Sequence, residues 1–343
     1  MMAGSTVRYL VLWLTTGCNL QCAYCYRGEQ EPRSMPEDVA RAALQLAAAS
    51  GLPFHVQLAG GEPMLEPQLI AFVGETIRKA GWPATLAVQT NGTLLDRGMI
   101  GLCRRHGISL GISLDGPPGV QDQTRGNAVA TFRGLHLLSR AGMPIRITSV
   151  LSSANVMHLG ELILALAAFP NIEGIGLDPL VHKGKALEGG QTRLSNDAIR
   201  RGIRNMLESL RPVNRLRPAP IRWRELDAVQ RAMSSETPPG VYCHACRGES
   251  LAVHPDGTVY PCSQTVGDDA MAVGTVERID WPKLRGLFRD LRLHGDCHEC
   301  PLEGRCPGDC PSRLMYNDAP AARAMCSIYR TIAEWSHEEK EVP

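Results

Sequence analysis

Three cysteines near the start of the chain, Cys18, Cys22 and Cys25, have the spacing C-x3-C-x2-C. Each iron of a four-iron cubane takes one thiolate, so three thiolates leave the fourth iron open. An open coordination position lets a metal centre bind a small molecule directly, which separates catalytic from structural sites. The alternatives are a three-ligand zinc site and reduced cysteines in the core. The spacing therefore predicts a catalytic iron–sulfur cluster.

Eight further cysteines follow residue 240, and eight thiolates suit two complete cubane clusters. They are Cys243, Cys246, Cys262, Cys297, Cys300, Cys306, Cys310 and Cys326. Taken alone, the paired C-x2-C units suit two zinc ions equally well. Cys103 stands apart within a helical pattern, and we expect it to be a small buried hydrophobe. His244 and His298 lie among the cysteines, where we expect supporting hydrogen bonds or plain exposure rather than metal ligation.

The composition is that of an ordinary globular protein. Of 343 residues, 44% are hydrophobic and 21% charged, and the net charge is +1, which gives no argument for a nucleic-acid partner. No apolar run reaches the roughly 18 residues that span a bilayer, and the N-terminus does not resemble a signal peptide. We therefore expect a cytoplasmic protein without a membrane partner. In that reducing compartment, clustered cysteines bind metal more readily than they form disulfides.

Short β-branched runs alternate with helical patterns from the N-terminus onward, which predicts an α/β fold with parallel strands. The predicted strands are Tyr9–Leu14, Phe54–Ala59, Thr85–Gln89, Ser109–Ser113, Ile145–Leu151 and Ile172–Leu177. The predicted helices include Pro36–Ala49, Pro67–Ala80, Leu94–His106 and Val156–Ala168. Six repeats fall short of the eight of a closed barrel. We therefore expect a partial (β/α)6 barrel with a small Cys-rich C-terminal domain.

Polar and glycine-rich segments follow four of these strands. They are the cysteine loop, Gly60-Gly61-Glu62-Pro63, Thr90-Asn91-Gly92 and Asp115-Gly116-Pro117. The carboxyl ends of parallel strands form the ligand-binding face of such folds, so the four segments predict one common site.

The chain is expected to divide near a Pro- and Arg-rich stretch, residues 211–220, that follows a predicted helix from Ser195 to Leu210. We expect the partial barrel in residues 1–212, a linker in 213–241 and the auxiliary-cluster domain in 242–335. Eight arginines lie between Arg200 and Arg224. They suit a solvated helix face, or alternatively an acidic peptide.

The segment Cys18-x3-Cys22-x-Tyr24-Cys25, followed by Tyr26, resembles the signature of the radical S-adenosylmethionine superfamily. This resemblance implies a [4Fe-4S] cluster whose open iron binds S-adenosylmethionine and breaks it into a 5′-deoxyadenosyl radical. The spacing C-x2-C-x5-C-x3-C from Cys297 to Cys310, with Cys326 beyond it, resembles the SPASM domain of enzymes that modify peptides and proteins.

The SPASM resemblance implies two auxiliary [4Fe-4S] clusters, and three clusters in all. The first would be bound by Cys243, Cys246, Cys262 and Cys310. The second would be bound by Cys297, Cys300, Cys306 and Cys326.

The resemblance also implies cofactor contacts outside the clusters. Gly60, Gly61, Glu62 and Pro63 would surround the methionine amino group, although Gly-Gly-Glu-Pro alone is only a turn. Contacts to the ribose, the carboxylate or the substrate would come from Thr90, Asn91, Ser113, Asp115 and Arg125. Polar residues after strands also cap helices, so these positions have a purely structural alternative. Tyr24 would pack near the adenine or wall the cluster from solvent.

These features predict a radical enzyme that oxidatively modifies a peptide or protein, with a flavodoxin- or ferredoxin-type reductant. Cys18 leaves no room for an N-terminal leader-binding domain, so we expect a separate leader-recognition protein. Sulfatase-modifying relatives carry a catalytic Asp where this chain has Ser263, so that activity would need Asp268 or Asp269 as the base.

Two alternatives remain for the function. One is the modification of a porphyrin or other small molecule, although the haem-pathway relatives often carry His where this chain has Tyr24. The other is a non-catalytic iron–sulfur electron carrier, which would usually bind its cubane through four thiolates.

Overall fold

The computed structural model describes residues 6–188, 194–235, 240–289, 291 and 297–341. The chain forms two compact units. Unit 1 contains Met1–Gln21, Arg27–Ile112 and Cys243–Leu291, and unit 2 contains Cys22–Tyr26, Ser113–Tyr242 and Arg292–Pro343. The two halves of the predicted C-terminal domain thus belong to different units. The assignment of domains to functions stays a prediction.

The parallel strands of unit 1 form in the predicted places. They are β1 (Tyr9–Thr15), β2 (Phe54–Gly60), β3 (Ala84–Thr90) and β4 (Ser109–Ser113), the last residue of which belongs to unit 2. β2 pairs in parallel with β1 and β3, and β3 pairs with β4. Six of the seven β1 residues are buried, because a strand inside a parallel sheet is covered on both faces and is therefore apolar throughout.

A strand from the far end of the chain completes this part of the sheet. β8 (Ser250–Val253) pairs in parallel with β1, and β9 (Val259–Tyr260) pairs antiparallel with β8. The sequence predicted a separate second domain from about Tyr242. A four-residue strand is too short to show its partner in a hydrophobic pattern. The hairpin of β10 (Gly274–Thr275) and β11 (Arg278–Ile279) follows.

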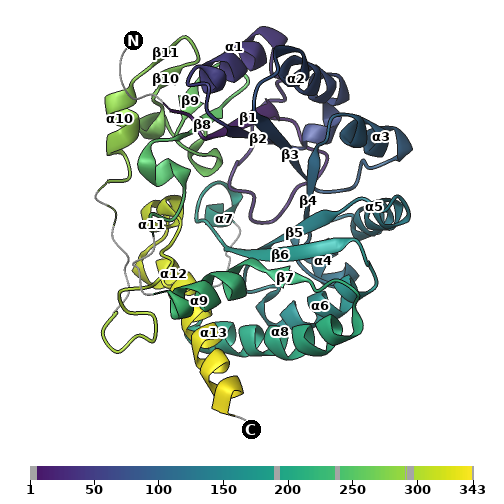
Figure 1. Cartoon of the computed structure of the whole chain (residues 1–343), viewed down its shortest axis with the longest axis vertical. Helices are drawn as coiled ribbons and strands as arrows, with labels where there is room; N and C mark the ends of the chain where they lie inside the picture. Colours follow the sequence, from purple (N-terminus) through teal and green to yellow (C-terminus); the bar gives the residue numbers. More distant parts are fainter. Residues whose placement is uncertain (1–5, 189–193, 236–239, 290, 292–296, 342–343) are drawn as a thin grey trace. The chain divides into compact units, whose positions relative to one another are not determined.

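The helices of unit 1 follow the rules for helix ends. They are α1 (Glu37–Ala48), α2 (Pro67–Ala80), α3 (Arg97–Arg105) and α10 (Trp281–Gly286). α2 begins with a proline and ends at Gly81 in the left-handed conformation, with φ of 64°. α3 begins at Asp96, whose carboxylate accepts the Met99 N–H at 2.7 Å. Figure 1 shows α1, α2 and α3 following one another beside the strands of this unit.

Unit 2 continues the alternation of strands and helices. Its strands are β5 (Ile145–Leu151), β6 (Ile172–Pro179) and β7 (Arg222–Trp223), all paired in parallel. Its first helices are α4 (Pro118–Thr124), α5 (Ala128–Arg140), α6 (Leu159–Ala167) and α7 (Lys185–Glu188). The later helices are α8 (Asn196–Leu216), α9 (Arg224–Ser234), α11 (Pro311–Tyr316), α12 (Ala319–Ala322) and α13 (Ala324–Glu341). In this unit α8 packs against α6 and α13 (Figure 1).

Helix α8 runs six residues beyond its predicted end and passes through Pro212. Proline removes one helical hydrogen bond and usually ends a helix. Here Val213 is buried on the same side as Leu210 and Met206, so side-chain packing outweighs the lost bond. The stretch predicted as a linker, residues 213–241, also contains β7 and the whole of α9.

The arginine-rich stretch is largely occupied by contacts within unit 2. Arg200 and Arg204 pair with Glu334 and Glu338 on α13, both at 2.6 Å. Arg217 donates to four main-chain carbonyls at the end of α6 and the start of β6, at 2.9–3.4 Å. These contacts support the interpretation of a helix face over that of a peptide-binding surface.

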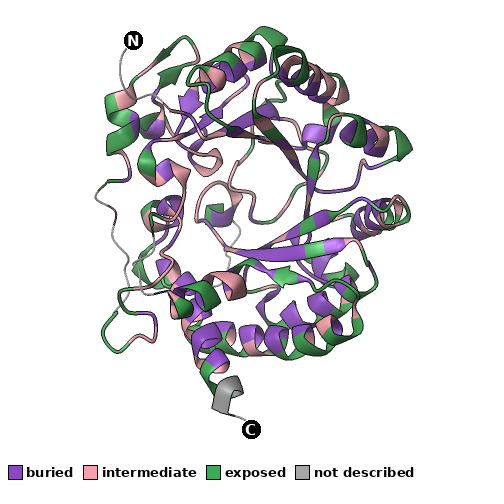
Figure 2. Cartoon of the chain, viewed as in Figure 1, coloured by how far each residue is buried: buried purple, intermediate pink, exposed green. Residues whose placement is uncertain are grey.

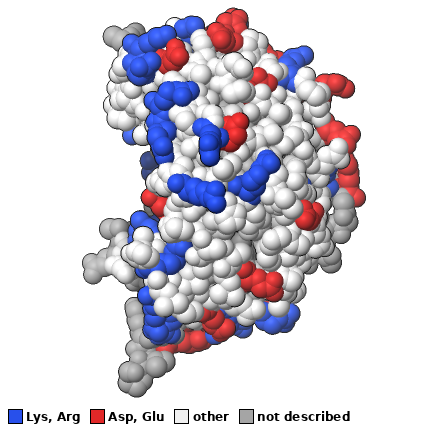
Figure 3. Space-filling model, turned by 90° about the vertical axis from the view of Figure 1, so that its right-hand side faces the viewer, with Lys and Arg blue, Asp and Glu red and all other residues white. Residues whose placement is uncertain are grey.

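Burial within each unit follows the strands and the inner helix faces, with the exposed residues on the outside (Figure 2). On the face in Figure 3, basic and acidic side chains both occur, in keeping with the net charge of +1. Among the described residues, no helix combines the length and the apolar character needed to cross a membrane.

Candidate functional site

The glycine pair at the end of β2 holds the main chain just before the first cysteine. The Gly61 N–H donates to Thr15 O at 2.8 Å, and the Glu62 N–H donates to Gly17 O at 2.9 Å. A Cβ atom would lie 2.3 Å from Thr15 O at position 60 and 1.9 Å from Gly17 O at position 61. The resemblance stated above implies that these glycines lie beside the methionine amino group. In the structure the close neighbour is the chain's own backbone.

Glu62 is buried and links the end of β2 to the end of β3. Its carboxylate accepts hydrogen bonds from Thr90 Oγ1 (2.6 Å), the Asn91 N–H (2.8 Å) and the Met64 N–H (3.0 Å). Burial raises the pKa of Glu62, and the three donors oppose that rise. Pro63, which begins the following turn, is also buried. Thr90 and Asn91 thus lie beside Glu62, as the common site predicts, and they fix its carboxylate.

Asn19, which the sequence did not single out, continues this network to the residue after Cys18. Asn19 Oδ1 accepts from Asn91 Nδ2 at 2.9 Å, and Asn19 Nδ2 donates to Thr93 Oγ1 at 2.8 Å. Asn91 Oδ1 in turn accepts the Thr93 N–H at 2.9 Å. The sequence could have indicated Asn19 only through its position directly after the predicted ligand Cys18. The main chain around Cys18 is therefore held from both sides within unit 1.

In unit 2 the structure brings together Tyr24, Asp115 and Arg125, three of the predicted residues. The Tyr24 hydroxyl donates to Asp115 Oδ2, and Arg125 Nε donates to the same oxygen at 2.9 Å. Asp115 Oδ1 accepts the Val150 N–H at 2.9 Å. The guanidinium of Arg125 also lies 5.4 Å from the centre of the Tyr24 ring.

This cluster of three residues is buried, because Asp115 is 0% and Tyr24 5% exposed. Burial raises the pKa of Tyr24 well above its ordinary value, so its hydroxyl stays protonated and remains a donor. Each Asp115 carboxylate oxygen has a protein donor. Asp115 thus has the structural role that the sequence left open as an alternative to a ligand contact. Through Tyr24, it anchors the segment between Cys22 and Cys25.

Two amide side chains that the sequence did not single out fix the main chain at Asp115. Gln121 Oε1 accepts the Asp115 N–H at 3.0 Å. Asn155 Nδ2 donates to Asp115 O at 3.0 Å and to Val150 O at 2.9 Å. Gln121 and Asn155 are both 0% exposed. In the sequence they are single polar residues in helical or loop segments, and such a residue gives no indication that it is buried.

Main-chain hydrogen bonds tie the cysteine loop to the rest of unit 2. The Ala23 N–H donates to Thr124 O at the end of α4, and the Lys185 N–H donates to Cys25 O, both at 3.0 Å. Ser113, the last residue of β4, is half-buried.

The predicted second auxiliary set lies wholly in unit 2 and consists of Cys297, Cys300, Cys306 and Cys326. Burial raises the pKa of Cys306, and the charges of Cys300 and Cys297 raise it further. Burial likewise raises the pKa of Cys326 to about 11, with contributions from Cys306 and Cys297. The binding of a second auxiliary cluster by this set stays a prediction.

Three cysteines of the predicted first auxiliary set lie in unit 1. Cys243 Sγ is 3.8 Å from Cys246 Sγ; Cys243 directly precedes the turn His244–Arg247 that comes before β8, and Cys246 lies within that turn. Cys262 follows β9 and is half-buried, and its carbonyl accepts from Thr265 Oγ1 at 2.8 Å. The fourth predicted ligand, Cys310, belongs to unit 2.

None of the twelve cysteines forms a disulfide in the part of the chain that the structure describes. Among the described residues, no three His, Cys, Asp or Glu side chains surround a single metal-ion position. Cys103 is buried on α3, and burial raises its pKa to about 11, as expected of an inert thiol. His244 Nδ1 lies 3.1 Å from Glu249 Oε2, and His298 is exposed.

Ser263 is held by an unexpected partner within unit 1. Trp13 Nε1 donates to Ser263 Oγ at 2.8 Å, and Trp13 is fully buried on β1. Asp268 Oδ1 accepts the Ala270 N–H at 3.1 Å and begins a short turn, while Asp269 is exposed. A serine that accepts a hydrogen bond from a buried indole is even less suited to act as a base.

Comparison with known proteins places these residues in a family. Residues 14–161 match the Radical SAM superfamily. The serine-type anaerobic sulfatase-maturating enzyme of Klebsiella aerogenes is 27% identical over 91% of this chain and 80% of its own length. The Fe-coproporphyrin III synthase of Methanosarcina barkeri is 28% identical over 60% of this chain and 52% of its own length.

Two solved structures show the fold of the whole chain. Native anSMEcpe with bound AdoMet and Cp18Cys peptide covers 97% of this chain and is itself covered to 97%, with a TM-score of 0.80 and 19% identity. Streptococcus suis SuiB bound to precursor peptide SuiA covers 92% of this chain and is covered to 74%, with a TM-score of 0.68 and 17% identity. The likeness includes the Cys-rich C-terminal region, which confirms the predicted fold class.

The matched segment contains Cys18, Cys22 and Cys25 together with the Glu62 and Asp115 networks, and the family implies a [4Fe-4S] cluster and S-adenosylmethionine. The chain therefore contains a radical SAM domain in residues 14–161, which makes it an enzyme, and it shares the fold of the anSMEcpe and SuiB structures over at least 92% of its length.

Proposed function

We propose that this enzyme cleaves S-adenosylmethionine reductively and oxidatively modifies a peptide or protein. The observation that carries the proposal is the share of the chain that matches proteins named for protein maturation or for a bound peptide. Relatives and structures whose names state protein maturation or a bound peptide match 91–97% of the chain. The match to the porphyrin enzyme covers only 60% of the chain.

Cys18, Cys22 and Cys25 would bind the cluster that takes the cofactor. When bound, this cluster supplies the electron that splits S-adenosylmethionine into methionine and a 5′-deoxyadenosyl radical. The residues around it would keep the loop in place. Glu62 and Asn19 fix the main chain near Cys18, and Asp115 with Arg125 fixes Tyr24.

Direct contacts to the cofactor remain part of the proposal. Gly60, Gly61, Glu62 and Pro63 would lie beside the methionine amino group. Thr90, Asn91 and Ser113 would line the adjoining ribose or substrate side, and Asp115 and Arg125 would act through Tyr24.

The C-terminal cysteines would bind two further [4Fe-4S] clusters. One of them would be bound by Cys297, Cys300, Cys306 and Cys326. The other would be bound by Cys243, Cys246, Cys262 and Cys310, as the sequence pattern predicts. Extra clusters suit an oxidation, because the substrate radical must lose one electron as well as one proton to give the product.

The partners follow from this chemistry. The reductant would be a flavodoxin or ferredoxin, and a separate protein would present the leader of the substrate peptide. We place the enzyme in the reducing cytosol, which suits clustered cysteines that form no disulfide among the described residues.

A first experiment tests the cofactor site. The full chain, reconstituted anaerobically with iron and sulfide, should bind about twelve irons and form 5′-deoxyadenosine from S-adenosylmethionine on reduction. Replacing Cys18, Cys22 and Cys25 together by Ala should abolish 5′-deoxyadenosine and leave about eight irons. Cys103→Ala is the control, because that thiol is buried outside the site. Deoxyadenosine formation by the triple variant would refute the site.

A second experiment separates a peptide substrate from a porphyrin. The enzyme is incubated with extracts of its source cells grown either on deuterated amino acids or on a deuterated porphyrin precursor. Because the radical takes a hydrogen atom from its substrate, the deuterium appears in 5′-deoxyadenosine, where mass spectrometry detects it. Transfer from a macromolecular fraction labelled through amino acids supports the proposal. Transfer only from the porphyrin label contradicts it and favours the porphyrin function.

A further inference from the structure

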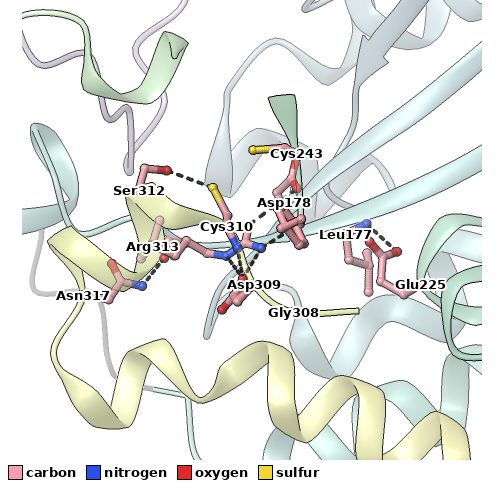
Figure 4. Close-up of polar contacts among 12 residues, drawn as sticks. Leu177, Asp178, Glu225, Cys243, Gly308, Asp309, Cys310, Ser312, Arg313 and Asn317 are labelled. Carbon is pink, nitrogen blue, oxygen red and sulfur yellow. Dashed lines mark hydrogen bonds and ion pairs between the residues drawn. The ribbon is translucent and has the colours of Figure 1, made fainter. Parts of the chain in front are cut away.

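A buried polar cluster surrounds Cys310 at the start of α11. It contains Ser312 and Arg313 from the same helix, Asp309 before it, and Tyr242 and Asp178 from elsewhere in unit 2. Ser312 is 0% and Arg313 2% exposed. Figure 4 shows Asp309 and Arg313 meeting Asp178, which lies at the end of β6, beside α11. So many buried polar groups around one cysteine call for a physical reason.

The Ser312 hydroxyl contacts the sulfur of Cys310 directly. Ser312 Oγ lies 3.0 Å from Cys310 Sγ (Figure 4). A cysteine that binds iron is a thiolate and has no proton to give, so the hydroxyl would be the donor. A hydrogen bond to a cluster sulfur withdraws negative charge and favours the reduced cluster, which carries one more electron.

Arg313 places a permanent positive charge beside the same cysteine. Its Nε donates to Asp309 Oδ1 at 2.8 Å, and its Nη2 donates to the Tyr242 hydroxyl at 3.1 Å. Its Nη1 lies 3.7 Å from Asp178 Oδ1. The pKa of Arg313 lies well above its ordinary value, because the charges of Asp309 and Cys310 outweigh its burial. The guanidinium therefore stays charged.

Asp309 has the opposite charge and is equally close. Its Oδ1 accepts the Cys310 N–H at 2.6 Å as well as the Arg313 Nε–H. Alone, a carboxylate in this position would oppose the addition of an electron to a centre bound by Cys310. Arg313 neutralises it in a site with little access to water. The charge balance at Cys310 therefore depends on this pair.

A wholly structural role is the alternative, since buried ion pairs also hold segments together. Breaking such a pair costs roughly 3–5 kcal/mol of stability whether or not a cluster is nearby. Stability alone gives no reason for a hydroxyl at 3.0 Å from the sulfur. The two roles differ in one respect: only in the second does the sign of each charge affect the reduction potential of the cluster.

We propose that Arg313 and Ser312 are positioning residues that raise the reduction potential of the iron–sulfur cluster bound through Cys310, against the opposing charge of Asp309. This inference rests on the proposed function, in which Cys310 is a cluster ligand. One-electron reduction adds one negative charge to that cluster, so a positive charge or a hydrogen-bond donor at Cys310 stabilises the product.

The test is a redox titration monitored by electron paramagnetic resonance, in the full chain with Cys18, Cys22 and Cys25 replaced by Ala. The two auxiliary clusters remain and give separate one-electron transitions. Arg313→Gln and Ser312→Ala should each lower one potential, and Asp309→Asn should raise the same one. Each change in the ratio of reduced to oxidised cluster should be at least tenfold at fixed potential, or about 59 mV.

Further variants separate charge from folding. Arg313→Lys retains the charge and should stay near the parent potential, and the double change Asp309→Asn with Arg313→Gln should also return towards it. Arg217→Gln is the matched control, because it removes a guanidinium whose partners are main-chain carbonyls at the end of α6. It should lower stability and leave both potentials unchanged.

The outcomes distinguish this inference from the function on which it rests. Shifts of opposite sign for Arg313→Gln and Asp309→Asn support it. Equal potentials in all variants, or shifts of one sign for both, overturn it even if the wild-type enzyme forms 5′-deoxyadenosine. Two normal auxiliary transitions without any 5′-deoxyadenosine from wild type overturn the proposed function alone. The absence of auxiliary transitions overturns both.

Discussion

Replacing Gly61 by Ala puts a methyl group into the main chain that precedes Cys18. The added Cβ would lie 1.9 Å from Gly17 O, with Thr16 O at 2.9 Å. Both neighbours are main-chain atoms, so no side chain can rotate away. A normal carbon–oxygen contact is about 3.3 Å. Gly17 must therefore move by roughly 1 Å, and Cys18 moves with it.

The size of the effect follows from that displacement. Forcing one extra carbon into a packed site costs about 1–3 kcal/mol of unfolding free energy. A shift of about 1 Å at a reacting group can lower the rate about 100-fold. We expect both losses in Gly61→Ala. Urea unfolding under anaerobic conditions measures the first, and the rate of 5′-deoxyadenosine formation in reconstituted enzyme measures the second.

Three other glycines in unit 1 separate the causes. Gly101→Ala in the middle of α3 meets only the end of Arg105 at 3.6 Å and should stabilise by about 0.5–1 kcal/mol. Gly51→Ala meets nothing within 4 Å, but its φ of 67° costs about 1–2 kcal/mol, so stability falls and activity stays. Gly60→Ala combines a φ of 123° with a Cβ 2.3 Å from Thr15 O and should be the most damaging. A Gly61→Ala enzyme that matches Gly101→Ala in stability and rate would refute the reasoning.

Three further predictions concern polar contacts. Tyr24→Phe removes a buried hydrogen bond to the Asp115 carboxylate and should lower the free energy of unfolding by about 1.5–3 kcal/mol. Asp115→Asn should lower it by about 3–5 kcal/mol, because Arg125 loses its counter-charge. Equal effects of the two variants in chemical denaturation would contradict this. Arg217→Ala should cost about 1–2 kcal/mol and Arg217→Lys should not restore it, because one ammonium group cannot reach four carbonyls, as thermal unfolding would test. Burial raises the pKa of Glu62 in the folded chain, so its stabilising contribution is complete below the unfolded value of 4.5 and is lost as the pH rises through the folded pKa. The stability advantage of wild type over Glu62→Gln should accordingly be larger near about pH 5 than near about pH 8 in the apo-protein, and a difference independent of pH would count against it.

The sequence was sufficient for the elements with strong local patterns. β4 and β5 and helix α2 have the predicted bounds, and the other four strands extend by one or two residues. Their apolar runs are long enough to specify both type and position. β7 has two residues and β8 has four, so only pairing with a distant partner makes them strands. The end of α8 depends on the packing of Val213, which propensity alone does not contain.

For the candidate site, the sequence predicted which segments meet but not what their side chains contact. The carboxyl ends of parallel strands bring Glu62 close to Thr90, as topology requires. The finding that Tyr24 and Arg125 share one oxygen of Asp115 depends on long-range geometry. The buried amides Asn155 and Gln121 gave no signal, because polar residues of these types are usually exposed.

The pairing of β1 with β8 has a consequence for biosynthesis. The two strands are about 240 residues apart in the chain, and ribosomes add about 5–20 residues per second. After β1 emerges, one of its edges lacks its partner for roughly 10–50 s. An apolar strand with an open edge can pair with other chains. Expression at lower temperature or with chaperones should therefore favour the native product, and a chain cut before residue 250 should aggregate.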